Sequence, residues 1–217
     1  MPIHPEEITG LILAGGRATR MGGVDKGLQL LNGEPMVHHV LRRLQPQVGH
    51  MLINANRNAQ EYRQFGVPVI ADMVSGFAGP LAGLQAGLAQ CTTGYLATAP
   101  CDSPLLPFDL VARLSGALEQ TGSDVAVAAT GTDGPPRGDA GTTSVAAAHW
   151  HPQRHPVFML AKASLLPQLS DWLAAGGRKA DDWLRSLRCA EVLFGDDGAF
   201  ENVNTSAHLT DMSRRLR

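Results

Sequence analysis

Apolar residues along the chain fall into short runs that alternate with segments of helical periodicity. The runs are typical of buried strands, and we expect strands over residues 8–14, 51–55, 67–71, 95–99, 124–129, 156–161 and 190–194. Apolar residues recurring every three or four positions predict helices over residues 35–44, 58–65, 80–91, 107–119, 164–175, 181–188 and 206–216. This alternation predicts an α/β domain with a parallel sheet covered on both faces.

Three features interrupt the alternation. Residues 28–31 suit a short extended piece that the Asn32-Gly33 turn closes. Residues 130–155 hold Gly, Pro, Thr, Ala and three His without a clear period, so we expect a long loop there. Ser206 suits the N-cap of the last helix.

Composition narrows the class of protein. The chain has 217 residues, 44% hydrophobic and 18% charged, which suits one globular domain over residues 1–217. The formal net charge of −2 gives no basic field for nucleic acid. Three cysteines without a CxxC pair argue against a disulfide framework or a zinc site. No signal peptide or spanning segment is evident, so we expect a cytoplasmic protein without a membrane partner.

The first expected strand opens into a glycine-rich, cationic loop. Ala14-Gly15-Gly16 ends the strand, and the cations that follow are Arg17, Arg20 and Lys26. Glycines let backbone N–H groups turn toward an anion, so the pattern predicts a polyphosphate site. It lacks the spacing of a P-loop or of a dinucleotide fingerprint. The alternative is a surface loop with solvated cations.

Polar side chains follow the ends of three further expected strands, where ligands bind in open α/β sheets. Asp102 lies between prolines just after a buried strand and suits Mg²⁺, which prefers one or two carboxylates plus substrate phosphates. It could equally cap the helix that Pro107 opens. Asn54, Asn56 and Asp72 could contact a base or a ribose, or simply form turns.

Other reactive side chains carry weaker signals. His151 and His155 have i,i+4 spacing, but Pro152 lies between them, and a loop that merely contains histidines is the alternative to a metal site. Cys101 reads as a small packing residue, because no sequence feature activates its thiol.

Taken together, these segments resemble the molybdenum cofactor guanylyltransferase family. The resemblance rests on LILAGGRATRMGGVDKGL at residues 11–28, NAN at 54–56, Asp72, GPLAGL at 79–84, APCDSP at 99–104, RHPVFML at 154–160 and NVNT at 202–205. It implies a three-layer, Rossmann-like nucleotidyltransferase fold with a mostly parallel central sheet. The implied reaction joins GTP to molybdenum-bound molybdopterin with Mg²⁺, giving the guanine dinucleotide cofactor and pyrophosphate.

The resemblance also implies roles for individual residues. GTP would contact Leu13, Ala14, Gly15, Gly16, Lys26, Asn54, Asp72 and Asp102. Of these, Lys26 would bind the phosphates with Arg20, and Asp102 would also hold the metal, so that Lys26, Arg20 and Asp102 form the catalytic set. Asn202 and Asn204 would face the active site. The second glycine, Gly16, favours guanine, because relatives that use CTP tend to have LAAG there.

The N-terminal half would therefore bind the nucleotide and the C-terminal part the molybdopterin. In that part Arg154, Lys162, Arg178 and Lys179 offer positive charge, or alternatively belong to a solvated surface. We expect a monomer that contacts cofactor-biosynthesis and acceptor proteins. Three alternatives remain: a cytidylyl- or sugar-phosphate nucleotidyltransferase, a non-catalytic partner that delivers cofactor, and a Rossmann oxidoreductase. The last is disfavoured because no acidic residue ends the second strand.

Overall fold

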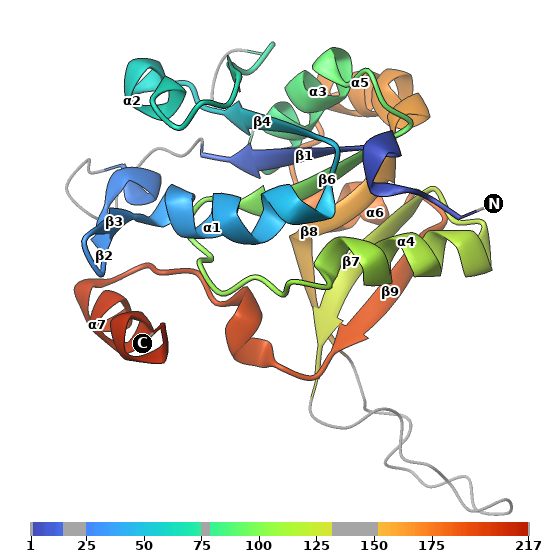
Figure 1. Cartoon of the computed structure of the whole chain (residues 1–217). Helices are drawn as coiled ribbons and strands as arrows, with labels where there is room; N and C mark the ends of the chain where they lie inside the picture. Colours follow the sequence, from blue (N-terminus) through green and yellow to red (C-terminus); the bar gives the residue numbers. More distant parts are fainter. Residues whose placement is uncertain (1, 15–24, 75–78, 132–151, 217) are drawn as a thin grey trace, which may run out of the picture.

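The computed structural model describes residues 2–14, 25–74, 79–131 and 152–216. A seven-stranded sheet in the order β5-β4-β1-β6-β8-β7-β9 forms its centre, with helices on both faces (Figure 1). The strands are β1 (Ile8–Leu13), β4 (His50–Asn54), β5 (Val69–Ile70), β6 (Tyr95–Pro100), β7 (Val125–Thr130), β8 (Gln153–Lys162) and β9 (Cys189–Phe194). A separate two-stranded ribbon pairs β2 (Leu30–Leu31) with β3 (Glu34–Pro35).

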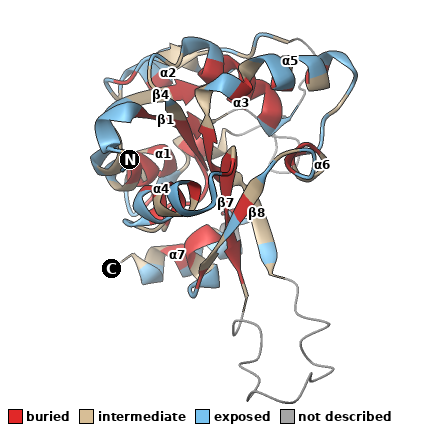
Figure 2. Ribbon diagram, turned by 90° about the vertical axis from the view of Figure 1, so that its right-hand side faces the viewer, coloured by how far each residue is buried: buried red, intermediate tan, exposed pale blue. Residues whose placement is uncertain are grey.

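Helices form two layers around the sheet, and the last helix, α7 (Ser206–Arg215), lies against the β2–β3 ribbon (Figure 1). The others are α1 (Met36–Leu44), α2 (Ala59–Arg63), α3 (Pro80–Gln90), α4 (Leu110–Thr121), α5 (Leu166–Ala174) and α6 (Ala180–Leu184). Figure 2 shows their buried sides against the strands and their exposed sides outward. No helix among the described residues is long and apolar enough to cross a membrane.

Side-chain alternation along β1 divides the core in two. Ile8 and Ile12 pack with α1 and α4 on one face, whereas Leu11 packs with α3, α5 and α6 on the other. Because both faces of the strand are covered, its sequence is a nearly continuous apolar run, broken only by the buried Thr9. The three-layer, mostly parallel α/β architecture expected from the sequence is confirmed.

One strand runs against the expected direction. β8 pairs antiparallel with both β6 and β7, while the other neighbouring pairs in the sheet are parallel. The chain leaves β7 and returns as β8 at the same edge of the sheet, and such a return makes the pairing antiparallel. An apolar run gives no strand direction, so the pattern alone could not predict this.

Several expected boundaries are wrong. The expected loop over residues 130–155 is shorter: Thr130 belongs to β7, and β8 begins at Gln153, because backbone pairing of Thr130 with Gln153 extends the ladder past the apolar residues. Residues 132–151 lie outside the described residues. Thr205, not Ser206, is the N-cap of α7, because its side chain accepts a hydrogen bond from the His208 amide. Pro35 precedes α1 and pairs with Leu30 in the ribbon.

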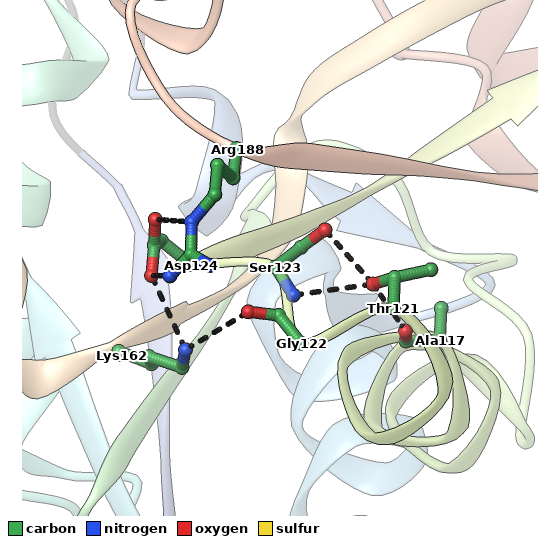
Figure 3. Close-up of polar contacts among 7 residues, drawn as sticks. All are labelled: Ala117, Thr121, Gly122, Ser123, Asp124, Lys162 and Arg188. Carbon is green, nitrogen blue, oxygen red and sulfur yellow. Dashed lines mark hydrogen bonds and ion pairs between the residues drawn. The ribbon is translucent and has the colours of Figure 1, made fainter.

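The edge of the sheet where β7 begins is fixed by a polar network (Figure 3). Asp124 accepts hydrogen bonds from Arg188 Nε at 2.9 Å and Arg188 Nη2 at 2.7 Å, and from Lys162 Nζ at 3.2 Å. The hydrogen bonds from Arg188 lower the pKa of Asp124. Lys162 also donates to the carbonyl of Gly122, the left-handed residue that ends α4. The network therefore joins α4, β7, β8 and the start of β9.

Two helical glycines test how tightly the layers pack. A Cβ at Gly87 in α3 would lie 2.5 Å from Leu11 Cδ2 and 2.9 Å from Leu96 Cδ2, whereas a Cβ at Gly116 in α4 would meet nothing within 4 Å.

We expect Gly87→Ala to lower the free energy of unfolding by about 1–3 kcal/mol, because overpacking outweighs the gain in helix propensity. Gly116→Ala should raise it by about 0.5–1 kcal/mol. Urea unfolding of both variants checks this, and an equal effect of the two would contradict it.

Candidate active site

Three neighbouring parallel strands, β4, β1 and β6, end side by side. The Ala14 amide donates to the Asn54 carbonyl at 2.8 Å, and the Cys101 amide donates to the Leu13 carbonyl at 3.1 Å. The backbone is thus held from both sides where it leaves β1. Gly15, Gly16 and Arg20 lie outside the described residues. Ala14 and Asp25, which flank them, are both held by hydrogen bonds.

An ion pair forms where the chain returns from that loop. Lys26 Nζ donates to Asp102 Oδ2 at 3.0 Å. Asp102 follows β6 and is 8% exposed, whereas the Lys26 side chain is 28% exposed. The structure therefore brings together two of the residues expected from the sequence, a cation and a carboxylate 76 positions apart.

The C-terminal segment completes this cluster. Lys26 Nζ also donates to Asn204 Oδ1, which lies 178 residues further along the chain. The Val203 amide donates to the Asp102 carbonyl at 2.8 Å, and Ser103 Oγ donates to Asn202 Oδ1 at 2.6 Å. Asn202 and Asn204 therefore lie at the Lys26–Asp102 pair.

An apolar anchor explains how this distant segment reaches the site. Val203 is fully buried in a small cluster with Leu31, Met36 and Met212. The cluster joins α7 to the β2–β3 ribbon, and that ribbon follows Lys26 in the chain. In Figure 1, α7 lies beside the ribbon.

A second polar group lies beyond the ends of β4 and β5. Asn54 Nδ2 donates to Asp72 Oδ1 at 2.9 Å, and Asn56 Nδ2 donates to Asp72 Oδ2 at 2.7 Å. The Asp72 amide in turn donates to Asn56 Oδ1 at 2.8 Å. Asn54 and Asp72 thus lie together as expected, and Asn56 joins them through hydrogen bonds to Asp72, 16 positions away, rather than through a local turn.

The first turns of α3 pack against the group formed by Asn54, Asn56 and Asp72. A Cβ at Gly83 would lie 2.4 Å from Asn54 Oδ1, so only glycine fits there with Asn54 in place. Asn54 is 2% exposed, and its amide is held in one orientation by Asp72. The GPLAGL segment therefore packs directly against the second polar group.

Asp25 has partners that were not predicted from the sequence. Asp25 Oδ1 accepts hydrogen bonds from the Gly27 amide at 3.1 Å and from the Tyr62 hydroxyl at 2.6 Å, and Asp25 Oδ2 accepts one from Asn58 Nδ2 at 2.9 Å. An aspartate just before a short helical turn is a capping signal, and that signal could have indicated Asp25. Nothing in the sequence pairs it with Tyr62.

Among the described residues, few carboxylates are placed to bind a metal ion. No group of three or more His, Cys, Asp or Glu that could hold a metal occurs within the described ranges. His155 instead accepts or shares a hydrogen bond with Thr130 Oγ1 at 2.8 Å and stacks on Phe200. Asp102 is a single, nearly buried carboxylate, and such a donor fits a cation that takes its remaining oxygens from phosphates and water.

The basic residues of the C-terminal third do not all lie near the site. Lys162 pairs in register with Tyr95, at the start of β6, and thus lies at the opposite edge of the sheet. Arg178 donates to the carbonyls of Leu173 and Gly177, which end α5. Arg154 forms an ion pair with Glu191. Lys162 therefore lies far from the Lys26–Asp102 pair, which leaves the alternative of a residue at the surface.

Comparison with known proteins gives consistent matches. Residues 10–192 match the family model described as the MobA-like NTP transferase domain. The chain is 52% identical over 216 residues to the molybdenum cofactor guanylyltransferase of Ralstonia nicotianae, covering 98% of this chain and 99% of that protein. It is 50% identical over 210 residues to the protein of that name from Bordetella petrii, covering 97% and 99%.

Solved structures share the fold. The molybdopterin-guanine dinucleotide biosynthesis protein A from Archaeoglobus fulgidus is 19% identical, with a TM-score of 0.72 over 96% of this chain and 98% of that one. The 4-diphosphocytidyl-2C-methyl-D-erythritol synthase from Anaerococcus prevotii is 11% identical, with a TM-score of 0.71 over 98% and 99%. At these identities the likeness concerns the fold alone.

Two thiols, Cys101 beside Asp102 and Cys189 at the start of β9, should be poorly reactive in the folded protein. Burial raises the pKa of Cys101 well above its usual value, and burial raises the pKa of Cys189 to about 11. Because the thiolate is the nucleophile, we expect Cys101 to resist iodoacetamide at pH 8 until the protein is unfolded. Labelling of Cys189 should quicken about tenfold per pH unit between pH 8 and 10. Peptide mapping by mass spectrometry checks both, and rapid labelling of native Cys101 would make it a reactive thiol after all.

Proposed function

The chain belongs to the family of MobA-like NTP transferases, and we propose how the site at its sheet edge serves the reaction of the molybdenum cofactor guanylyltransferases it resembles. The protein is a nucleotidyltransferase that transfers GMP from GTP to the terminal phosphate of molybdenum-bound molybdopterin. The products are the guanine dinucleotide cofactor and pyrophosphate.

The pairing of Lys26 with Asp102 is the observation by which we assign this reaction to the site at the sheet edge. The reaction brings the anionic phosphate of molybdopterin to the α-phosphorus of GTP, while negative charge builds on the leaving pyrophosphate. A fixed cation beside the strand end offsets both effects. We therefore assign Lys26 to the phosphates, together with Arg20 from the glycine-rich loop.

The donor chemistry of Asp102 fits a divalent cation. Magnesium bound by Asp102 and by phosphate oxygens would supply positive charge that stabilises the developing charge on the phosphates. Lys26 would then exchange its contact with Asp102 for contacts with the phosphates. No protein nucleophile is required, because a phosphate monoester is already largely ionised at neutral pH. The chain contributes position and electrostatics.

The second polar group suits the nucleoside end of GTP. Asn54 and Asp72 lie beyond neighbouring strand ends, and the backbone of Leu13 to Gly16 begins the loop between them and Lys26. We assign the base and ribose to Asn54 and Asp72, and the phosphates to the loop. The second glycine of the loop, Gly16, favours guanine over cytosine. Molybdopterin is left to the C-terminal part, where Asn202 and Asn204 adjoin the ion pair.

The cellular setting follows from the substrates and the thiols. All three cysteines are free, which suits a reducing compartment. We place the reaction in the cytoplasm and assign it to a monomer that meets cofactor-biosynthesis and acceptor proteins only transiently.

The central test is pyrophosphate release with a molybdopterin-loaded donor and Mg²⁺, offering GTP, CTP and ATP separately. We expect release with GTP and its loss on chelation by EDTA. Release with CTP instead would retain the chemistry but overturn the assignment of Gly16. Binding of GTP without any release would favour a non-catalytic partner that delivers cofactor.

Removing the Lys26 ammonium should reduce turnover strongly. We expect Lys26→Ala to lose two to three orders of magnitude in kcat, roughly the loss seen for a donor that stabilises transition-state charge. Lys162→Ala is the matched control, because it removes a lysine paired with an aspartate at the opposite edge of the sheet. Steady-state pyrophosphate release measures both. Equal losses in the two variants would mean that Lys26 acts through general charge or stability.

A further inference from the structure

The conformation around Lys26 depends on a carboxylate outside the catalytic set assigned above, that of Asp25. Lys26 begins the 3-10 turn Lys26–Leu28, and Asp25 is the N-cap of that turn. Asp25 Oδ1 accepts the Gly27 amide, which fixes the turn that directs the Lys26 side chain. The position of the ammonium therefore follows the position of the Asp25 carboxylate.

That carboxylate is in turn held from α2. Tyr62 donates its hydroxyl to Asp25 Oδ1 at 2.6 Å, and Asn58 donates its side-chain amide to Asp25 Oδ2 at 2.9 Å. Asn58 has a φ of 52°, a left-handed conformation that non-glycine residues rarely adopt. Both oxygens of Asp25 are thus occupied by donors from one short segment.

The Tyr62 side chain is fixed by burial. It is fully buried in the core cluster that also contains residues of α1 and of the sheet. Burial raises the pKa of its hydroxyl, so the group stays protonated and acts as a donor. A ring held on all sides gives its hydroxyl one position.

The turn after Lys26 also packs closely against Tyr62. A Cβ at Gly27 would lie 2.4 Å from the Tyr62 hydroxyl oxygen and 3.1 Å from Cys101 Sγ. Gly27 therefore packs against Tyr62 and against the residue just before Asp102. The segment that carries the cation thus contacts both the Tyr62 hydroxyl and the segment that carries the carboxylate.

We propose that Tyr62, acting through Asp25, is a positioning residue that holds the Lys26 ammonium at the phosphate edge of the site. Resting on the function proposed above, this inference adds a residue that touches neither substrate nor reacting atoms. Without the Tyr62 hydroxyl, the turn Lys26–Leu28 gains freedom, and Lys26 must be ordered anew in each transition state. The cost falls on kcat, because preorganised charge matters most where charge develops.

The test compares the two tyrosines of the chain. Tyr62→Phe keeps the ring and removes only the hydroxyl, and Tyr95→Phe does the same at the opposite edge of the sheet. We expect Tyr62→Phe to lower kcat about tenfold, the equivalent of one net hydrogen bond, with less than about a twofold change in KM for GTP. Tyr95→Phe should leave kcat unchanged, and both should keep wild-type circular dichroism.

A double-variant cycle separates positioning from a general structural role. If Tyr62 acts through Lys26, adding Tyr62→Phe to Lys26→Ala should cost nothing further in kcat. Multiplication of the two losses, or an unchanged kcat in Tyr62→Phe alone, would overturn the proposal.

A crystal structure of Tyr62→Phe gives a readout that does not need activity. We expect Lys26 Nζ to leave Asp102 Oδ2, from which it lies 3.0 Å in the wild-type chain. An unmoved Lys26 would overturn the positioning role even with an active enzyme. Lys26 could be displaced in Tyr62→Phe while the wild-type protein releases no pyrophosphate. That pair of results would uphold the positioning role and reject the proposed function.

Discussion

The ion pair between Lys26 and Asp102 is the contact on which the rest of the site depends. Each charge lies next to water yet is largely enclosed by protein, so neither is stable there without a partner. Parallel pairing of β1 with β6 brings the two chain segments to one edge, and backbone bonds at Leu13 and Asp102 hold them. A triphosphate with its cation can replace both partners at once. The same pair therefore serves the resting protein and prepares it for substrate.

A comparison of the two edges of the sheet shows how similar groups acquire different roles. Asp124 has an arginine and a lysine as partners, and both come from elements that the sheet fixes. The Asp102 carboxylate accepts a hydrogen bond from the ammonium of Lys26, whose long side chain can turn away. The Val203 amide donates to the Asp102 carbonyl, and Ser103 donates to Asn202. The first carboxylate accepts hydrogen bonds from two cations at once and joins β7 to its neighbours in the sheet. The second can exchange its partner, and exchange is what chemistry on phosphates requires.

Much of the site could be predicted from the sequence because strand ends are visible in it. Asn54, Asp72 and Asp102 each follow an apolar run, and parallel strands bring such residues to one edge. The direction of β8 could not be predicted, because a buried strand has the same composition in either direction. The position of Lys162 follows from the same feature, since an antiparallel β8 carries its last residue to the far edge. Asp25 and Tyr62 escaped notice because their contact depends on the packing of α2, which no periodicity reports.

The C-terminal segment gives the site a long reach in sequence. Lys26 and Asn204 are 178 residues apart, and the buried Val203 holds the segment of Asn204 in the cluster with Leu31, Met36 and Met212. Contacts over so long a separation carry a high entropy of loop closure until the strands between them have paired. The polar cluster therefore has the highest contact order in the site, and we expect it to form after the sheet that supports it.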